Sequence, residues 1–100
     1  MRFGLEERII KDIISVIDKH ESVKKAVIFG SRARGDYRYN SDIDFAIYTD
    51  GRACPGLIDD IDRAAGIYKV NVVDVNGLEN DDLKKSIERD GIEIYRRADI

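Results

Sequence analysis

Apolar side chains recur in two different periods along this chain, and each period predicts a different kind of element. In the first twenty residues they return every three or four positions, as on one buried face of a helix, which predicts a helix over about residues 4–19. The same spacing predicts a second helix that starts near Leu57 and stops at Gly66, and a third that Asn80 caps and that ends near Gly91. The apolar face of the first helix consists of Leu5, Ile9, Ile10, Ile13, Ile14 and Ile17.

Short runs rich in β-branched and aromatic residues lie between these helices. They predict strands over residues 26–29, 42–48, 68–75 and 92–95. Strands that alternate with helices favour an α/β domain, with a central mixed β-sheet and helices packed against it. The chain has 100 residues, of which 43% are hydrophobic, and this is enough for one modest core. We therefore expect a single domain over residues 1–100.

A glycine and a serine follow the first predicted strand and precede a short predicted helix. Gly30 allows the backbone to approach a ligand closely, while Ser31 offers a hydroxyl and the free amides of a helix start. Gly35 closes this short helix, and Arg32 and Arg34 add cationic donors. The segment therefore predicts a phosphate site, with Gly30, Ser31, Arg32 and Arg34 as nucleotide-binding residues.

Two aspartates open the next predicted strand. Asp42 and Asp44 alternate with apolar residues, so their side chains share one face of the strand. Two neighbouring carboxylates repel each other unless a cation lies between them, and carboxylates together with substrate phosphates are ligands that suit Mg²⁺. Either a Gly-Ser turn or a DxD pattern alone is commonplace, but the two at this spacing indicate a nucleotide site with Asp42 and Asp44 as catalytic metal ligands.

The stretch GSRARGDYRYNSDIDFAIY resembles the signature of the polymerase-β-like nucleotidyltransferase superfamily, and in particular its minimal nucleotidyltransferase (MNT) branch. The resemblance implies the fold of that superfamily. It also implies that Gly30 and Ser31 hold the phosphates of ATP and that Asp42 and Asp44 bind Mg²⁺. The reaction implied is transfer of a nucleoside monophosphate, commonly AMP, to a hydroxyl, with release of pyrophosphate.

The family pattern also contains a third carboxylate on a later strand, which serves as a metal ligand or general base. Here the matching position holds Asn71, whose amide can coordinate a cation but brings no charge and no basicity. Asp74 lies three residues further along the same strand and therefore points to the opposite face, which favours a structural role for it. We keep Asn71 as a catalytic-site residue and expect an attenuated enzyme.

The resemblance further implies a partner. Members of the MNT branch are often paired with a HEPN-domain toxin and act as its antitoxin by adenylylating a tyrosine, which makes a toxin–antitoxin role the first hypothesis. A second hypothesis is a catalytically degenerate module that neutralises a HEPN partner by binding alone, and Asn71 favours it. A third, modification of a small hydroxylated molecule, is weaker because so short a chain offers little surface of its own for a substrate.

The charge, the hydrophobic runs and the cysteine content indicate what the protein binds and in which compartment it is found. A formal net charge of −3 argues against direct binding of nucleic acid, and the apolar runs are only a few residues long, which predicts neither a signal peptide nor a membrane span. The single cysteine, Cys54, cannot form an internal disulfide. We expect a cytoplasmic protein, and the sequence leaves open whether it assembles as a homo-oligomer or a hetero-oligomer.

Overall fold

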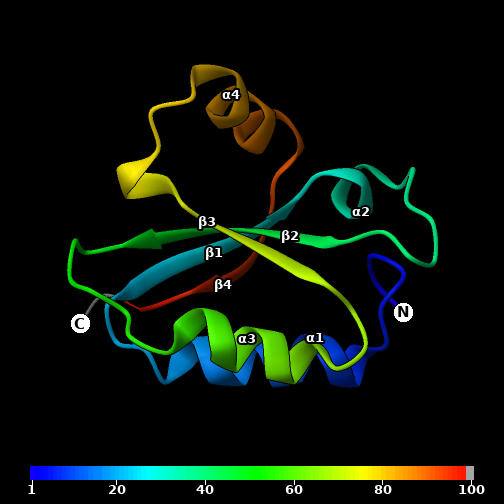
Figure 1. Cartoon of the computed structure of the whole chain (residues 1–100), viewed down its shortest axis with the longest axis horizontal. Helices are drawn as coiled ribbons and strands as arrows, with labels where there is room; N and C mark the ends of the chain where they lie inside the picture. Colours follow the sequence, from blue (N-terminus) through cyan, green and yellow to red (C-terminus); the bar gives the residue numbers. More distant parts are fainter. Residues whose placement is uncertain (99–100) are drawn as a thin grey trace.

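The computed structural model describes residues 1–98, which form a four-stranded sheet with helices on both faces (Figure 1). Each α-helix and strand predicted from the sequence is present, and a 3₁₀ turn lies between the third strand and the last helix. In chain order the elements are α1 (Glu7–Asp18), β1 (Val23–Phe29), α2 (Ser31–Arg34), β2 (Ile43–Thr49), α3 (Leu57–Ala65), β3 (Val70–Asp74), η1 (Val75–Gly77), α4 (Asp81–Asp90) and β4 (Ile92–Arg96).

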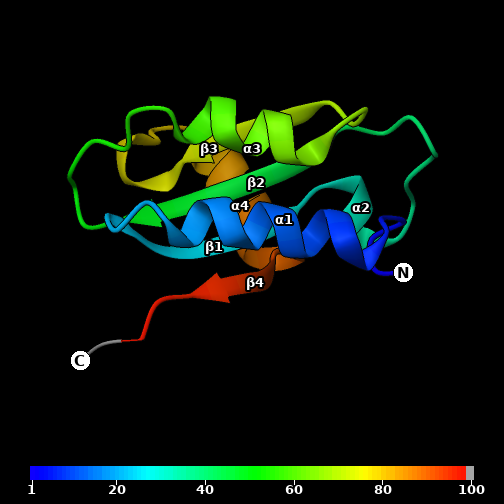
Figure 2. The ribbon, with the colours of Figure 1, turned by 90° about the horizontal axis from the view of Figure 1, so that it is seen from below.

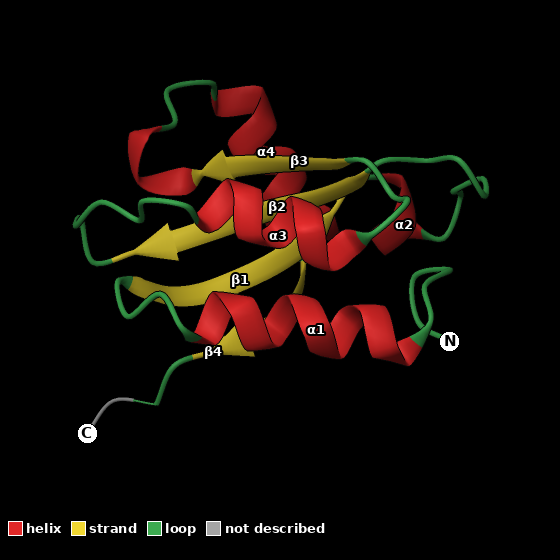
Figure 3. Ribbon diagram, turned by 60° about the horizontal axis from the view of Figure 1, so that its bottom comes forward, coloured by secondary structure: helices red, strands yellow, loops and turns green. Residues whose placement is uncertain are grey.

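The sheet is mixed and its strands follow the order β3-β2-β1-β4 (Figure 3). β1 pairs antiparallel with both β2 and β4, whereas β2 and β3 run parallel. The α/β class with a central mixed sheet is therefore confirmed. Because β1 and β2 are antiparallel and β2 and β3 are parallel, the end of β1 meets the starts of β2 and β3 at one end of the sheet.

The hydrophobic core has two parts, one on each face of the sheet. α1 and α3 lie side by side over one face (Figure 2), and the isoleucines and leucines of their inner sides pack on the larger cluster. α4 covers the opposite face, where Ile87 packs against Val27, Phe29 and Ala46. Both faces of β1 and β2 are thus covered, which explains why these two strands read as nearly continuous apolar runs.

The element boundaries differ from the predicted ones by a few residues. α1 begins at Glu7 and not near residue 4, because Arg2 and Leu5 exchange two backbone hydrogen bonds in a tight turn before it. The predicted cap of α4 is confirmed, since the side chain of Asn80 accepts a hydrogen bond of 3.1 Å from the backbone N–H of Leu83. Over the part of the chain that the structure describes, no helix is both long and apolar enough to cross a lipid bilayer.

Candidate active site

Gly30 connects the end of β1 to α2 in a conformation that only glycine adopts readily. Its φ of +75° and ψ of −157° lie outside the regions open to other residues. A Cβ atom at this position would collide with the carboxylate of Asp44. The backbone of the predicted phosphate turn therefore lies directly against one of the two predicted metal ligands.

α2 is the short helix predicted after this turn. Its first backbone bond runs from the N–H of Arg34 to the carbonyl of Gly30 (3.0 Å), and Gly35 ends it with a φ of +94°. Ser31 is its first residue and is half-buried. The amides at the start of so short a helix have no partner further back in the helix, so they are free to receive an anion.

Arg32 has a different position from the one predicted. Its side chain is only 2% exposed, and its guanidinium donates to three backbone carbonyl groups. Nη1 lies 2.9 Å from the oxygen of Phe3, Nη2 lies 2.8 Å from that of Ser41 and 3.4 Å from that of Tyr39, and Nε also bonds Ser41. These bonds tie the N-terminal turn to the connector before Asp42. Arg32 thus stabilises the backbone next to the site, and its buried guanidinium is bonded to the protein's own carbonyl groups.

Replacing Arg32 with methionine should reduce the free energy of unfolding by about 1 to 3 kcal/mol, because it removes the hydrogen bonds of a buried guanidinium to partly buried backbone carbonyls. Urea unfolding of the two proteins measures the difference. Arg38 is exposed in the same connector, so Arg38→Met is the matched control and should change the stability by less than about 0.5 kcal/mol. Equal effects of the two substitutions would show that the buried hydrogen bonds of Arg32 do not stabilise the fold.

Arg34 points outward and joins α2 to α4. It lies 3.2 Å from Asp36 and 3.4 Å from Asp90, the last residue of α4, which also accepts bonds from Arg89. The hydrogen bonds from Arg89 and Arg34 lower the pKa of the Asp90 carboxyl. The sequence gives no signal for this link between residues 56 positions apart. Arg34 retains further N–H donors, so its predicted contact with a nucleotide stays a prediction.

Asp42, Asp44 and Asn71 come together at the end of the sheet where α2 lies. The pairing of β2 with β3 places Asn71 beside Asp44. The Nδ2 atom of Asn71 donates to Oδ2 of Asp42 (3.1 Å) and to Oδ1 of Asp44 (3.0 Å). The two carboxylates therefore converge on one point, as the DxD pattern predicts.

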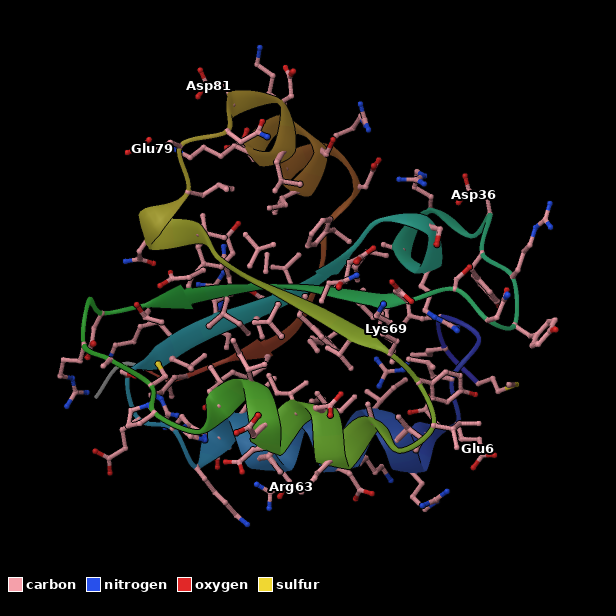
Figure 4. The ribbon with its side chains drawn as sticks, viewed as in Figure 1. Glu6, Asp36, Arg63, Lys69, Glu79 and Asp81 are labelled. Carbon is pink, nitrogen blue, oxygen red and sulfur yellow. The ribbon has the colours of Figure 1, made fainter. Side chains whose placement is uncertain are left out.

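Figure 4 shows how this end of the molecule is built. Lys69, just before β3, and Asp36, just after α2, both lie toward the end of the sheet that holds the carboxylates. Glu79 and Asp81, at the start of α4, lie at the opposite end. The site is therefore formed where β1 ends and where β2 and β3 begin, and the acidic start of α4 is remote from it.

The donor set of the site fits one magnesium ion. It supplies two carboxylates and one amide group, and hard oxygen ligands of this kind suit Mg²⁺ when substrate phosphates and water complete the coordination. Among residues 1–98 no group of three His, Cys, Asp or Glu side chains is arranged to hold a metal ion. Asn71 is thus the third protein group at the site, and it is uncharged.

Asp74 does not join this cluster. It pairs with Ile47 along the sheet, and its carboxylate accepts a hydrogen bond from the backbone N–H of Asn76 (3.0 Å), which caps η1. The structural role predicted for Asp74 is confirmed, and the side chain cannot replace the missing third carboxylate.

Comparison with known proteins agrees with this geometry. Residues 11–100 match the family described as "Polymerase beta, Nucleotidyltransferase". The chain belongs to this nucleotidyltransferase family. The match spans the phosphate turn, both aspartates and Asn71, so the predicted superfamily and enzyme class are confirmed.

This nucleotidyltransferase is similar in sequence to one named relative and in structure to chains of two toxin–antitoxin complexes. A protein of Methanocaldococcus jannaschii named "Putative protein adenylyltransferase MJ1379" is 31% identical over 94 residues, covering 81% of this chain and 93% of that protein. Among solved structures, a chain in a toxin–antitoxin crystal structure with AMP-PNP aligns with a TM-score of 0.74 at 20% identity, covering 88% of this chain and 73% of that chain. A chain in the complex of a tri-AMPylated Shewanella oneidensis HEPN toxin with its MNT antitoxin aligns with a TM-score of 0.69 at 17% identity, covering 93% and 74%.

Proposed function

We propose that this nucleotidyltransferase uses ATP and Mg²⁺ to transfer AMP to a hydroxyl group of a partner protein, and that the partner is a HEPN-type toxin that it neutralises. The contact between Gly30 and the carboxylate of Asp44 carries the proposal. Because the phosphate turn and the metal ligands touch, a triphosphate held at Gly30 and Ser31 lies within reach of a cation held by Asp42 and Asp44.

The comparisons support the choice of nucleotide, acceptor and partner. The relative from Methanocaldococcus jannaschii carries the name of a protein adenylyltransferase, and one structural neighbour contains AMP-PNP. Another neighbour is a complex in which a HEPN toxin carries three AMP groups and is bound to an MNT antitoxin. An acceptor hydroxyl on a partner protein also agrees with the small size of the described domain, whose sheet and helices are occupied by its own core.

The chemistry is a displacement at phosphorus. The acceptor oxygen bonds the α-phosphorus of ATP, the bond from that phosphorus to the bridging oxygen breaks, and pyrophosphate leaves with the electron pair. In this proposal Gly30 and Ser31 hold the phosphates in line for attack, and Arg34 adds a charged donor. Neutralisation of phosphate charge is the chemistry that Mg²⁺ supplies when bound at Asp42 and Asp44. The hydroxyl proton goes to solvent, since Asn71 has no basic atom.

A second candidate function is neutralisation of the partner by binding alone. Its supporting observation is Asn71, which replaces a carboxylate in the family pattern and here hydrogen-bonds both remaining carboxylates. A module that no longer catalyses has no need of charge at this position. The two functions predict the same complex and differ in whether the partner becomes modified.

Labelled ATP tests the proposed reaction. The chain is mixed with its HEPN partner, Mg²⁺ and ATP labelled on either the α- or the γ-phosphate. Transfer of AMP moves the α-label onto the partner and leaves the γ-label in pyrophosphate. Labelling from the γ-phosphate would identify a kinase, and no labelling of a partner that still forms a complex would favour binding alone.

Asn71→Asp should raise the rate of AMP transfer by about tenfold to a hundredfold. A well-placed general base contributes roughly 10²- to 10⁴-fold, and a carboxylate restored at this position recovers part of that. The initial rate of partner labelling with α-labelled ATP measures the change. If Asn71→Asp transfers AMP no faster than the unsubstituted chain, the missing carboxylate is not what limits the reaction.

A further inference from the structure

The amide group of Asn71 lies where a cation would be expected. A single nitrogen, Nδ2, donates one hydrogen bond to Asp42 and one to Asp44. Nδ2 lies 3.1 Å from Oδ2 of Asp42 and 3.0 Å from Oδ1 of Asp44, so the amide directs its partial positive charge between the two carboxylates, on the side where a shared cation would bind.

We propose that Asn71 is a positioning residue that makes this a site for one divalent cation. In this structure its Nδ2 bridges the two carboxylates. When a cation binds, the amide turns about its Cβ–Cγ bond and presents Oδ1 to the ion. The proposal rests on the proposed function only in taking Asp42 and Asp44 as the cation ligands.

The geometry requires the amide to move. A cation and the NH₂ group of Asn71 would compete for the same two carboxylate oxygens. The partial positive charge of the NH₂ group would also repel the cation. A half-turn of a carboxamide exchanges its donor for its acceptor with almost no change in shape. Asn71 is solvent-exposed, which leaves room for this rotation.

The charge of the site limits it to one ion. In two-metal sites the cations lie about 3.5 to 4 Å apart and repel each other strongly, so anionic ligands must surround both. Here the protein supplies two carboxylates, and residues 1–98 hold no third acidic side chain in the cluster. A carboxylate at position 71 supplies the missing charge, so Asn71→Asp should convert the site to one that holds two cations.

Thermal unfolding in EDTA tests the structural part of the proposal. Asn71→Ala removes the bridging donor and Asn71→Asp adds a third negative charge, so each should lower Tm by about 4 to 8 °C. Addition of Mn²⁺ should recover Tm in Asn71→Asp but not in Asn71→Ala. Asn40 is exposed and has no hydrogen bond among the described residues, so Asn40→Ala and Asn40→Asp are matched controls and should leave Tm nearly unchanged. An unchanged Tm for Asn71→Ala would overturn the bridging role.

Counting bound Mn²⁺ tests the stoichiometry. The electron paramagnetic resonance signal of free Mn²⁺ is followed while the ion is added to the chain with an ATP analogue that has a non-hydrolysable α,β-bond. We expect one Mn²⁺ per complex for the unsubstituted chain and for Asn40→Asp, and two for Asn71→Asp. Two ions bound to the unsubstituted chain, or one bound to Asn71→Asp, would overturn the one-cation site. Neither readout depends on AMP transfer, so failure of the proposed function leaves both results interpretable.

Discussion

Replacing Asp44 with alanine should slow AMP transfer at least about a thousandfold, because charge stabilisation at a metal site contributes several kcal/mol and each 1.36 kcal/mol is a factor of ten in rate. The carboxylate lies against Gly30 and accepts a hydrogen bond from Asn71. Its removal therefore takes away both a proposed cation ligand and a side chain that packs against the phosphate turn. The chain should remain folded, since the substitution also relieves repulsion between Asp44 and Asp42. Initial rates of partner labelling measure the loss.

Asp59→Ala is the matched control for this prediction. Asp59 is exposed on α3, which covers the sheet face opposite α4, and its substitution should leave the rate of transfer unchanged. Thermal unfolding of both variants separates lost chemistry from lost structure. A folded Asp44→Ala protein with a rate within a few-fold of the original would place the reaction elsewhere on the molecule.

Gly30→Ala should reduce transfer by about a hundredfold or more, since small displacements at a reaction centre have effects of this size. It should also lower the free energy of unfolding by about 2 to 4 kcal/mol, because it adds a steric clash to the cost of a positive φ. The added methyl group would collide with the Asp44 carboxylate and force it away from Asp42 and Asn71. Urea unfolding and partner labelling measure the two effects.

Gly51→Ala is a control that adds backbone strain at a positive φ without displacing the Asp44 carboxylate. Gly51 also has a positive φ, of +96°, but a Cβ atom there meets no atom within 4 Å. This variant should lose about 1 kcal/mol of stability and keep its full rate of transfer. If Gly30→Ala behaved in the same way as Gly51→Ala, the close contact between the phosphate turn and Asp44 would have no functional role.

The elements of the fold are predictable from the sequence because each depends on local patterns. Periodic isoleucines predict α1, Gly66 predicts the end of α3 and Asn80 predicts the start of α4, and the structure confirms all three. The start of α1 is less accurate, since apolar Leu5 continues the helical period although the chain there forms a turn stabilised by its own backbone bonds. Such a turn cannot be predicted from the hydrophobic pattern, because its hydrogen bonds join backbone groups.

The composition of the site is only partly predictable. The pattern brings Gly30, Asp42, Asp44 and Asn71 to notice, but the amide bridge depends on the parallel register of β2 and β3, which distant residues determine. The position of Arg32 is even less visible, because its partners are backbone carbonyls, one of them 29 residues earlier in the chain. A backbone acceptor has no residue type, so no sequence motif reveals it.

Intact mass spectrometry of the HEPN partner tests the central claim most directly. The partner is incubated with this chain, ATP and Mg²⁺, and in parallel with the Asp42→Ala variant. The proposed function predicts a mass increase of one or more AMP units that is absent with Asp42→Ala. An unchanged partner mass in a complex that still forms and still neutralises the partner would contradict it and establish binding alone as the function.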